Sequence, residues 1–582
     1  MGTFISLTSY KNPLLKEQQF FNRENYYVSN ENEFKNIPNS IYAYEVSERT
    51  AECFEFDPLG KHFVTREGMA TAGNDVFLRL WFEVAFGRIT FDCTSEEESV
   101  EKKVKWVPYN KGGGTRFWYG NNDYVVDWSD NGLAIRNNKD PKTGRIRSHN
   151  YNGIYGFKEG LTWSAISSGN ISVRYCEAGF LFDSKGAKGF PIKKEDMFWI
   201  LGLLNSKVSM QFLKFISPTL DFKVGDVICI PFNCVDGSKQ EISEISNKLV
   251  ESSKQDWDMF ETSWGFERHP LIGTGLLSDL YSIYENDLEQ RFANHKALHE
   301  ELNRLLIADY GFAGELSPEL EDSDIDIRKA DLHRDVVSLI SYAVGCIMGR
   351  YSLKENALIY AGGTWDTSHY SDEFKPCEYG ILPITEEQFF DEDLCTRVVD
   401  FIKIVYGDTF LNENLKFIAT ALKPDSYDAP KKILREYLFN DFFGDHYQVY
   451  QHRPIYWQLD SGKAGGFRAI AYMHRFNENT LPLVRTEFIQ DLRYKYEEEM
   501  QRQKNRLEGA STTAETNAVK KEIAALDKKI VECAAYDELL NHATSSIQKY
   551  LFDLDDGVKT NYAKFLSIDG DNSSNILTVI KL

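Results

Sequence analysis

The amino-acid sequence predicts a multidomain α+β protein. A chain of 582 residues, 42% of them hydrophobic and 26% charged, is globular in composition and too long for one hydrophobic core. From about residue 60 to 235, short β-type runs alternate with Gly, Asn and Asp turns. From 238 to 310, apolar residues recur every three or four positions, which is the spacing of amphipathic helices.

The pattern along the chain predicts five parts. Apart from a helical stretch at 194–216, residues 60–237 are typical of a mixed α/β domain, with β-type runs at 86–93, 122–128, 179–183 and 224–232. Two charged helical segments at 485–550, separated by the sequence EGASTT, predict a helical hairpin. The predicted parts are 1–59, a connector or the tail of another domain; 60–237; 238–319, a helical spacer; 320–484, a second mixed domain; and 485–582, the helical hairpin with the C-terminal tail.

The charge of the chain is unevenly distributed. Residues 1–240 hold 29 basic and 29 acidic side chains, so the whole net charge of −22 lies in 241–582. Within the neutral part, residues 101–215 carry 18 basic against 10 acidic side chains. A local excess of this kind is what binding to a phosphate backbone requires, although the protein as a whole is acidic.

The sequence KWVPYNKGGGTRFWYGNN at 105–122 is the most distinctive stretch of this basic part. Its glycines at 112–114 permit positive φ and a close approach of the backbone to a ligand. Lys111 and Arg116 could neutralise phosphates, and Asn121 and Asn122 could read adenine, although both asparagines are equally compatible with a turn. Further candidates for contacts with phosphate, sugar or bases are Lys105, Arg145 and Arg147 and the aromatic residues Trp106, Tyr109, Phe117, Trp118 and Tyr119.

Other constellations in the sequence favour structural explanations. His295 and His299 are one helical turn apart, but two ligands are too few for a zinc site, so we expect them on a helix surface and predict no metal. Asp92 with the sequence EKK at 101–103 is a weak match to a metal-dependent nuclease. The sequence GTGLL at 273–277 lacks the lysine of a phosphate-binding loop, and 552–561 does not match a calcium loop.

The composition also bears on the compartment. No apolar run is long enough to span a bilayer, and the first residues lack the pattern of a signal peptide, so we expect a cytoplasmic protein with no membrane partner. Nine cysteines are scattered without a CxxC pair, which favours reduced thiols in the core.

Eight segments, in order, resemble the C-terminal part of the PglX family, the adenine-specific DNA methyltransferases of bacterial BREX phage-defence systems. The family's catalytic portion carries an Asn/Asp-Pro-Pro-Tyr/Phe motif and a glycine-rich loop for S-adenosylmethionine, and neither occurs in this sequence. The resemblance therefore implies that this chain binds no cofactor, is inactive by itself, and relies on a separate catalytic domain for S-adenosylmethionine. The segments that carry the resemblance are 66–84, 105–128, 160–175, 201–232, 256–272, 341–353, 453–475 and 553–562.

The resemblance implies that residues 60–240 recognise a short sequence of double-stranded DNA. It adds Arg79, Lys185 and Lys188 to the candidate DNA contacts, and it implies that the partners are a methyltransferase catalytic domain or other BREX proteins. Two other functions stay open at this point. The acidic part at 241–582 could make the chain a protein-interaction scaffold with little DNA binding, and Asp92 with Glu101 could belong to a nuclease.

Overall fold

The computed structural model describes residues 2–7, 9–29, 37–38, 46–166, 169–217, 221–545, 552–566 and 575–581. Their contacts divide them into two units. Unit 1 comprises Met1–Leu78, Thr90–Trp257 and Gln290–Arg328, and unit 2 comprises Arg79–Ile89, Asp258–Glu289 and Lys329–Leu582. The short segment Arg79–Ile89 thus belongs to unit 2, although the sequence on both sides of it belongs to unit 1.

Two larger sheets lie in unit 1, besides a small one near the N-terminus. The first is antiparallel and has the order β3-β10-β7-β8, formed by β3 (Phe63–Arg66), β10 (Lys188–Pro191), β7 (Gly160–Trp163) and β8 (Val173–Cys176). In the second, β5 (Trp106–Asn110) pairs antiparallel with β6 (Tyr124–Asp127) and parallel with β9 (Leu181–Phe182). β4 (Leu78–Leu80) spans the point at which the chain leaves unit 1. The short helices α3 (Asn74–Phe77), α4 (Glu96–Glu101) and α5 (Ser129–Arg136) connect these strands.

The predicted helical stretch at 194–216 forms two helices, α6 (Met197–Leu204) and α7 (Lys207–Ile216). The break falls at Ser206, whose hydroxyl accepts the backbone N–H of Ser209 and thereby caps α7. The predicted β-run at 224–232 is wrong in part, because Val224–Val227 form the helical turn α8. The run at 86–93 is also wrong, since Phe86–Arg88 form a 3₁₀ turn, whereas the runs at 122–128 and 179–183 contain β6 and β9.

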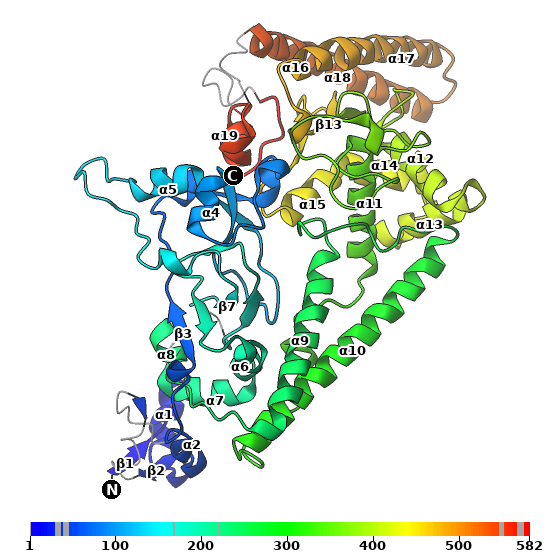
Figure 1. The fold of residues 1–582 in the computed structure, drawn as a ribbon. Coiled ribbons are helices and arrows are strands. Elements are labelled where there is room, and N and C mark those ends of the chain that lie inside the picture. Colours follow the sequence, from blue (N-terminus) through cyan, green and yellow to red (C-terminus); the bar gives the residue numbers. More distant parts are fainter. Residues whose placement is uncertain are drawn as a thin grey trace. The chain divides into compact units, whose positions relative to one another are not determined.

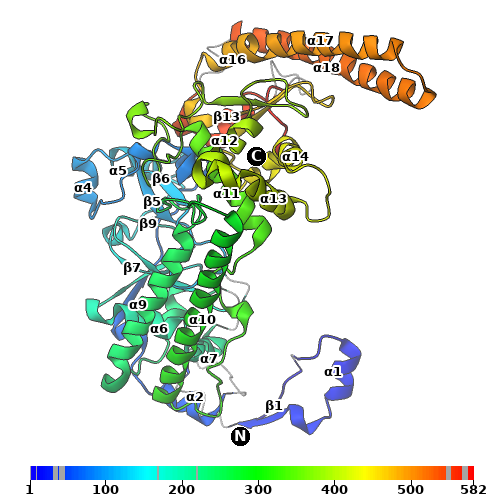
Figure 2. The ribbon, with the colours of Figure 1, turned by 90° about the vertical axis from the view of Figure 1, so that its right-hand side faces the viewer.

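The core of unit 1 lies between α6 and the long helices α9 (Asp236–Asp258) and α10 (Leu277–Asp309). In both ribbon views the second half of α10 runs beside α9 (Figures 1 and 2). A Cβ atom on Gly202 of α6 would lie 2.5 Å from the Ser246 hydroxyl of α9, so only glycine permits this approach. The buried apolar side chains include Ile200 and Leu204 of α6, Ile242 and Leu249 of α9, and Leu302 and Leu306 of α10.

The remaining described elements of unit 1 lie near the N-terminus. β1 (Gly2–Ile5) and β2 (Tyr26–Ser29) pair antiparallel, with α1 (Pro13–Gln19) between them in sequence, and α2 (Glu48–Cys53) follows. Part of the predicted connector, residues 8, 30–36 and 39–45, lies outside the described residues.

Unit 2 combines helices with one antiparallel sheet of the order β11-β13-β12, formed by β11 (Ile381–Ile384), β13 (Arg468–Tyr472) and β12 (Tyr456–Asp460). The predicted helical hairpin is present as α17 (Gln490–Glu508) and α18 (Thr513–Ser545), which pack side by side (Figure 2). The other helices are α11 (Leu332–Met348), α12 (Leu394–Tyr406), α13 (Leu411–Leu422), α14 (Pro430–Asn440), α15 (Phe442–Val449), α16 (Thr480–Leu483) and α19 (Gly557–Ala563).

The predicted α+β class with several parts is confirmed, while the five domain boundaries stay a prediction. Among the described helices, none combines the length and the apolar character needed to cross a bilayer. All nine cysteines are free thiols, and seven of them are buried. For Cys53, burial raises the pKa to about 11, so its thiol stays protonated at neutral pH.

Candidate nucleic-acid interface

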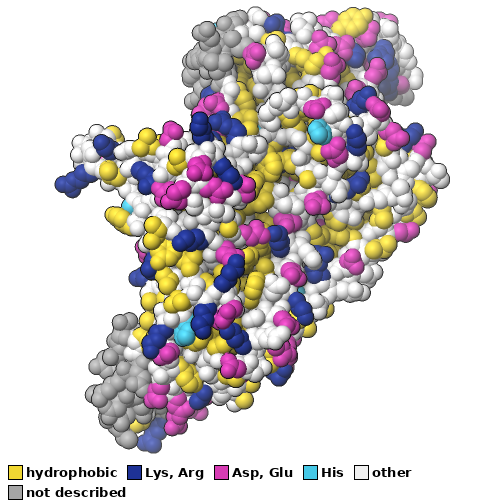
Figure 3. All heavy atoms as spheres, in the orientation of Figure 1, with side chains coloured by type: hydrophobic (Ala, Val, Ile, Leu, Met, Phe, Trp, Pro, Cys, Tyr) yellow, Lys and Arg dark blue, Asp and Glu magenta, His cyan; other side chains and the backbone are white. Residues whose placement is uncertain are grey.

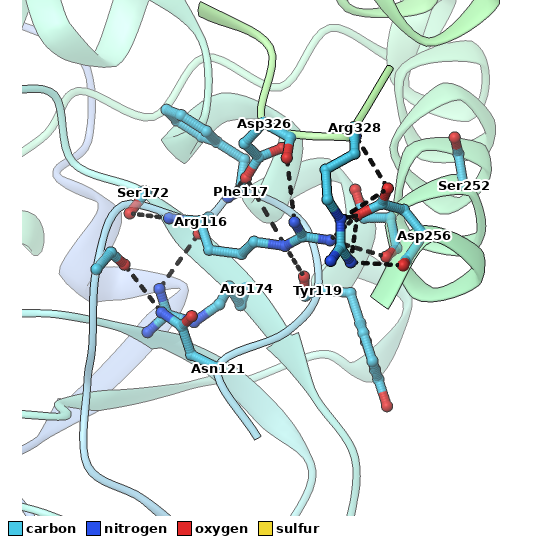
Figure 4. A network of polar contacts seen from close by, with 12 residues as sticks. Arg116, Phe117, Tyr119, Asn121, Ser172, Arg174, Ser252, Asp256, Asp326 and Arg328 are labelled. Carbon is cyan, nitrogen blue, oxygen red and sulfur yellow. Dashed lines mark hydrogen bonds and ion pairs between the residues drawn. The ribbon is translucent and has the colours of Figure 1, made fainter. Parts of the chain in front are cut away.

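Arg116, a predicted phosphate contact, lies inside unit 1 with only 8% of its surface exposed. All three nitrogens of its guanidinium group donate hydrogen bonds within the protein (Figure 4). Nε donates to the Tyr119 carbonyl at 3.1 Å, Nη1 to the Asp326 carbonyl at 3.1 Å, and Nη2 to the Asp256 carboxylate at 2.8 Å and to the Ser253 carbonyl at 3.2 Å. We therefore assign Arg116 to the support of the 111–122 loop and not to the surface of the interface.

The network also includes the charged groups of Arg328, Arg174 and Asp326 (Figure 4). Arg328 shares the Asp256 carboxylate with Arg116, and Arg174 donates to the Arg116 carbonyl at 3.2 Å. Burial disfavours ionisation of Asp256, but Arg328 and Arg116 outweigh it and lower the pKa of that carboxyl. Burial has the larger effect on Asp326 and raises its pKa, although Arg116 opposes the rise. The network holds the loop against the C-terminal end of α9 and the segment 326–328.

The three glycines of the loop form a turn next to this network, in which Gly113 and Gly114 are exposed and Gly112 is buried. Gly112 and Gly113 have φ values of 94° and 133°, a region that other residues rarely adopt. Asn121 donates to the Gly114 carbonyl at 2.9 Å, and the Ser164 hydroxyl donates to the Gly113 carbonyl at 3.0 Å. Asn121 thus stabilises the turn in this structure, and Asn122 is buried. In the glycine turn, residues 111–115, the exposed positions are Gly113, Gly114 and Thr115.

The predicted aromatic contacts of this stretch mostly belong to the core. Trp106, Tyr109 and Trp118 are fully buried, and Tyr119 is nearly so. The Tyr109 hydroxyl donates to the Asp183 carboxylate and to the Met69 carbonyl, both at 3.0 Å. Lys105 forms an ion pair with Asp127 at 2.7 Å. The high aromatic content of this stretch therefore reflects packing between the sheets.

The lysines that the sequence singled out occupy different environments. Lys185 is exposed, and its backbone carbonyl lies beside Gly112 of the glycine turn. Lys111 is partly exposed, with its ammonium group 4.7 Å from the centre of the Tyr124 ring. Lys188 is fully buried, and its ammonium group donates to the Lys158 carbonyl at 2.5 Å. Lys188 is therefore a structural residue, because a group buried in this way is not available to a phosphate.

Arg145 and Arg147 lie in a hairpin formed by residues 137–149, which follows α5. Both arginines are exposed, as are Lys139 and Lys142 in the same hairpin. In Figure 1 the segment that follows α5 extends away from the rest of unit 1, and Figure 3 shows Lys and Arg side chains at the corresponding edge. Lys139 and Lys142 were not predicted as contacts, although the sequence DPKTG at 140–144 is a turn signal that could have located the hairpin.

Segment 69–71 connects the hairpin to the glycine turn. On one side, Ala70 exchanges backbone hydrogen bonds with His149 at 2.9 and 3.0 Å. On the other side, the Met69 N–H donates to the Phe182 carbonyl at 2.8 Å, and the Ser184 N–H donates to the Met69 carbonyl at 3.2 Å. Lys185 and the base of the hairpin are thus held on opposite sides of a single extended segment. Lys111, Lys139, Lys142, Arg145, Arg147 and Lys185, with residues 112–115, are called the basic face below.

Arg79 belongs to unit 2, where its Nε donates to the Asp555 carbonyl at 3.1 Å. A Cβ atom on Gly557, which has φ 73°, would lie 2.6 Å from Cδ of Arg79, so the side chain packs directly on this turn. Arg79 therefore holds the C-terminal segment of unit 2, and we do not include it in the basic face.

Within the described residues, the other candidate sites of the sequence have structural roles. His295 and His299 are buried and not on a helix surface as expected; His295 contacts the Ser252 hydroxyl at 3.1 Å, and His299 contacts the Asn205 carbonyl at 3.1 Å. Burial lowers their pKa values to about 3 and about 4. Asp92 pairs with Lys102 at 2.9 Å. Within the described ranges, no group of three or more His, Cys, Asp and Glu side chains is arranged to hold a metal ion.

Comparison with known proteins identifies two relatives that are similar to this chain over all or most of its length. The sequence is 40% identical over its full length to the adenine-specific methyltransferase PglX of Lacticaseibacillus casei (strain Zhang), of which it covers 49%. It is 34% identical over 94% of its length to the adenine-specific methyltransferase BrxX of Escherichia coli O9:H4 (strain HS), of which it covers 46%.

No family model matches the chain. The chain spans about half the length of the curated relatives it matches. The resemblance found in the sequence is therefore confirmed: this chain is a homologue of one half of the adenine-specific methyltransferases PglX and BrxX.

Proposed function

We propose that this chain recognises double-stranded DNA for a BREX-type adenine-specific DNA methyltransferase active in phage defence. Unit 1 makes the DNA contacts. Methyl transfer is carried out by a separate catalytic domain, which carries the catalytic motif and the loop for S-adenosylmethionine. The similarity to PglX and BrxX supports the link to adenine-specific methylation. No Asn/Asp-Pro-Pro-Tyr/Phe motif occurs in the sequence, so we assign no S-adenosylmethionine contact to its residues.

The observation that carries this proposal is the basic face of unit 1. Lys185, Arg145 and Arg147 are exposed, whereas the buried cations Arg116 and Lys188 are neutralised or hydrogen-bonded within the protein. Exposed cations beside a backbone turn made of glycines can meet several phosphates of a duplex at once. All the cations of this face lie within residues 101–215, which carry 18 basic against 10 acidic side chains.

The first test measures binding of the purified chain to a random-sequence DNA duplex by fluorescence anisotropy, across a range of salt concentrations. Because each neutralised phosphate contributes about 0.9 to the slope of log K against log salt, the chain is expected to lose affinity steeply between about 50 and 200 mM salt. The variant Lys111→Ala/Lys185→Ala should bind more weakly and reduce the slope by about 2.

The matched control is Lys416→Ala/Lys431→Ala, which removes two exposed lysines of unit 2. Its affinity and its slope should equal those of the unchanged chain. A chain that fails to bind DNA at low salt, yet captures other BREX proteins in a salt-insensitive way, would instead indicate the scaffold function. Metal-dependent cleavage of the duplex that is lost in Asp92→Ala would indicate a nuclease.

A further inference from the structure

The hairpin 137–149, called the ribbon below, is a short antiparallel hairpin with one β-bridge, between Lys139 and Ile146, and it is fixed at its base. The Arg147 N–H donates to the Asn138 carbonyl at 2.9 Å, and the Asp140 N–H donates to the Arg145 carbonyl at 2.8 Å. At the base, the Asn138 amide donates to the Thr71 carbonyl at 2.8 Å, and the buried Ser148 hydroxyl donates to the Ile135 carbonyl. The ribbon is therefore anchored to the rest of unit 1 at one end.

The tip of the ribbon is a tight turn that its own acidic residue closes. The Asp140 carboxylate accepts the backbone N–H groups of Lys142 at 3.0 Å and Thr143 at 2.8 Å, and these bonds lower the pKa of the carboxyl. Gly144 has φ 68°, which the turn requires. Lys139, Lys142, Arg145 and Arg147 outnumber the single carboxylate of Asp140, so the ribbon has a net positive charge.

The two faces of the ribbon carry different side chains. Arg145 and Arg147 are two positions apart and therefore lie on the same face. Ile146 lies on the opposite face together with Lys139, with which it forms a bridge. Ile146 is 57% exposed, and Tyr151, which follows the ribbon and stacks on His149 at 4.8 Å, is 85% exposed. Both faces of the ribbon are thus uncovered, and both carry positive charge.

We propose that this ribbon enters the major groove of duplex DNA and reads bases there. The inference rests on the proposed function. A two-stranded ribbon fits the major groove, about 12 Å wide, but not the minor groove of about 6 Å. Inside a groove, the face with Arg145 and Arg147 meets the base edges, while the lysines reach the phosphate backbones beside it, which explains why cations lie on both faces.

The residues of the ribbon divide into two roles. Arg145 and Arg147 carry the planar, forked guanidinium group that pairs with O6 and N7 of guanine, and they are the base-reading residues. Lys139 and Lys142 contact phosphates as point charges.

The test begins with selection of a preferred duplex from a random pool by the 582-residue chain. Protection of the selected duplex from dimethyl sulfate then separates the grooves, because the reagent methylates guanine N7 in the major groove and adenine N3 in the minor groove. We expect protection at guanine N7. The variant Arg145→Ala/Arg147→Ala should lose that protection, and its preference for the selected duplex over a scrambled one should fall by about tenfold or more.

A charge-preserving variant separates base reading from phosphate contact. Arg145→Lys/Arg147→Lys keeps both charges but removes the forked donors, so it should retain most of the affinity for scrambled DNA and lose the preference. A lysine variant that keeps the preference would contradict the role of the forked group, because lysine also pairs with guanine O6 and N7. If Arg145→Ala/Arg147→Ala keeps the preference and the N7 protection, or if adenine N3 is protected instead, the ribbon does not read the major groove, and DNA binding by unit 1 still stands. If the unchanged chain binds no duplex, both proposals fail.

Discussion

Arg116 and Asp256, which are 140 positions apart in the sequence, form a buried ion pair in which Nη2 lies 2.8 Å from Oδ2. The pair connects the glycine-rich loop to the C-terminal end of α9. It makes the geometry of an exposed turn dependent on a helix that is distant in sequence. The network around the pair therefore controls the shape of the basic face without itself being exposed.

Replacing Arg116 should destabilise unit 1. Removal of one partner of a buried ion pair typically costs about 3–5 kcal/mol, because the other charge stays buried; here Arg328 still neutralises Asp256, so Arg116→Ala should cost about 3 kcal/mol. Arg116→Lys should recover little of this loss, since one ammonium group cannot reach carbonyls and a carboxylate on three sides. Urea unfolding measures the difference, and a loss below about 1 kcal/mol would contradict the role of the network.

The glycine turn offers a matched pair of substitutions. A Cβ atom at Gly113 would lie 2.8 Å from the Asn121 amide nitrogen and would force alanine into φ 133°, whereas no atom lies within 4 Å of a Cβ at Gly114. Gly113→Ala should therefore destabilise the protein by about 1–3 kcal/mol and weaken DNA binding, while Gly114→Ala should stay within about 0.5 kcal/mol of the unchanged chain. Thermal unfolding and anisotropy of both variants check this, and equal behaviour of the two would refute it.

Substitutions at Lys185 and Lys188 should have different effects, the first on DNA affinity and the second on stability. Lys188 is fully buried and donates to the Lys158 carbonyl, so Lys188→Ala should lower the unfolding free energy by about 1.5–3 kcal/mol. Lys185 is exposed, so Lys185→Ala should change stability by less than about 0.5 kcal/mol and act on DNA affinity alone. Each variant is assayed by urea unfolding and by DNA binding, and the opposite pattern would show that the buried lysine is the DNA contact.

Unit 2 contains a buried carboxyl whose titration should be visible in its stability. The Glu261 carboxylate accepts the Tyr450 hydroxyl at 3.0 Å and the Ser341 hydroxyl at 3.2 Å, and only 4% of the residue is exposed. Burial raises the pKa of Glu261 to about 7 from 4.5, although Arg350 opposes the rise. The folded protein therefore holds a proton that the unfolded chain has already released between pH 4.5 and 7.

The free energy of unfolding of unit 2 should accordingly contain a term that falls as pH rises from about 4.5 to about 7. The term is fully present below pH 4.5, is lost as pH passes 7, and amounts to on the order of 3 kcal/mol. Glu261→Gln, which does not titrate, should remove it. The measurement is urea unfolding of both proteins across this pH range, and parallel stability curves would contradict the raised pKa.

Local sequence patterns predicted several elements whose form depends on residues close together in the sequence. The period of the apolar residues predicted α9 and α10, and EGASTT at 508–513 predicted the break between α17 and α18. The β-run at 224–232 was wrong at Val224–Val227 because short apolar runs fit a helical turn as well as a strand. Such runs take the form that their packing partners favour.

The sequence by itself determined the α+β class, the long helices, the relation to PglX and BrxX, and the positive charge of residues 101–215. Arg145 and Arg147 were found because they lie in the basic part of the sequence, whereas the hairpin that carries them was not predicted. Only the tertiary structure decided that Arg116 and Lys188 are buried, and that Arg79 holds a segment 476 positions away. The physical reason is that exposure and pairing of a charge depend on residues brought together by folding, and sequence spacing carries no record of them.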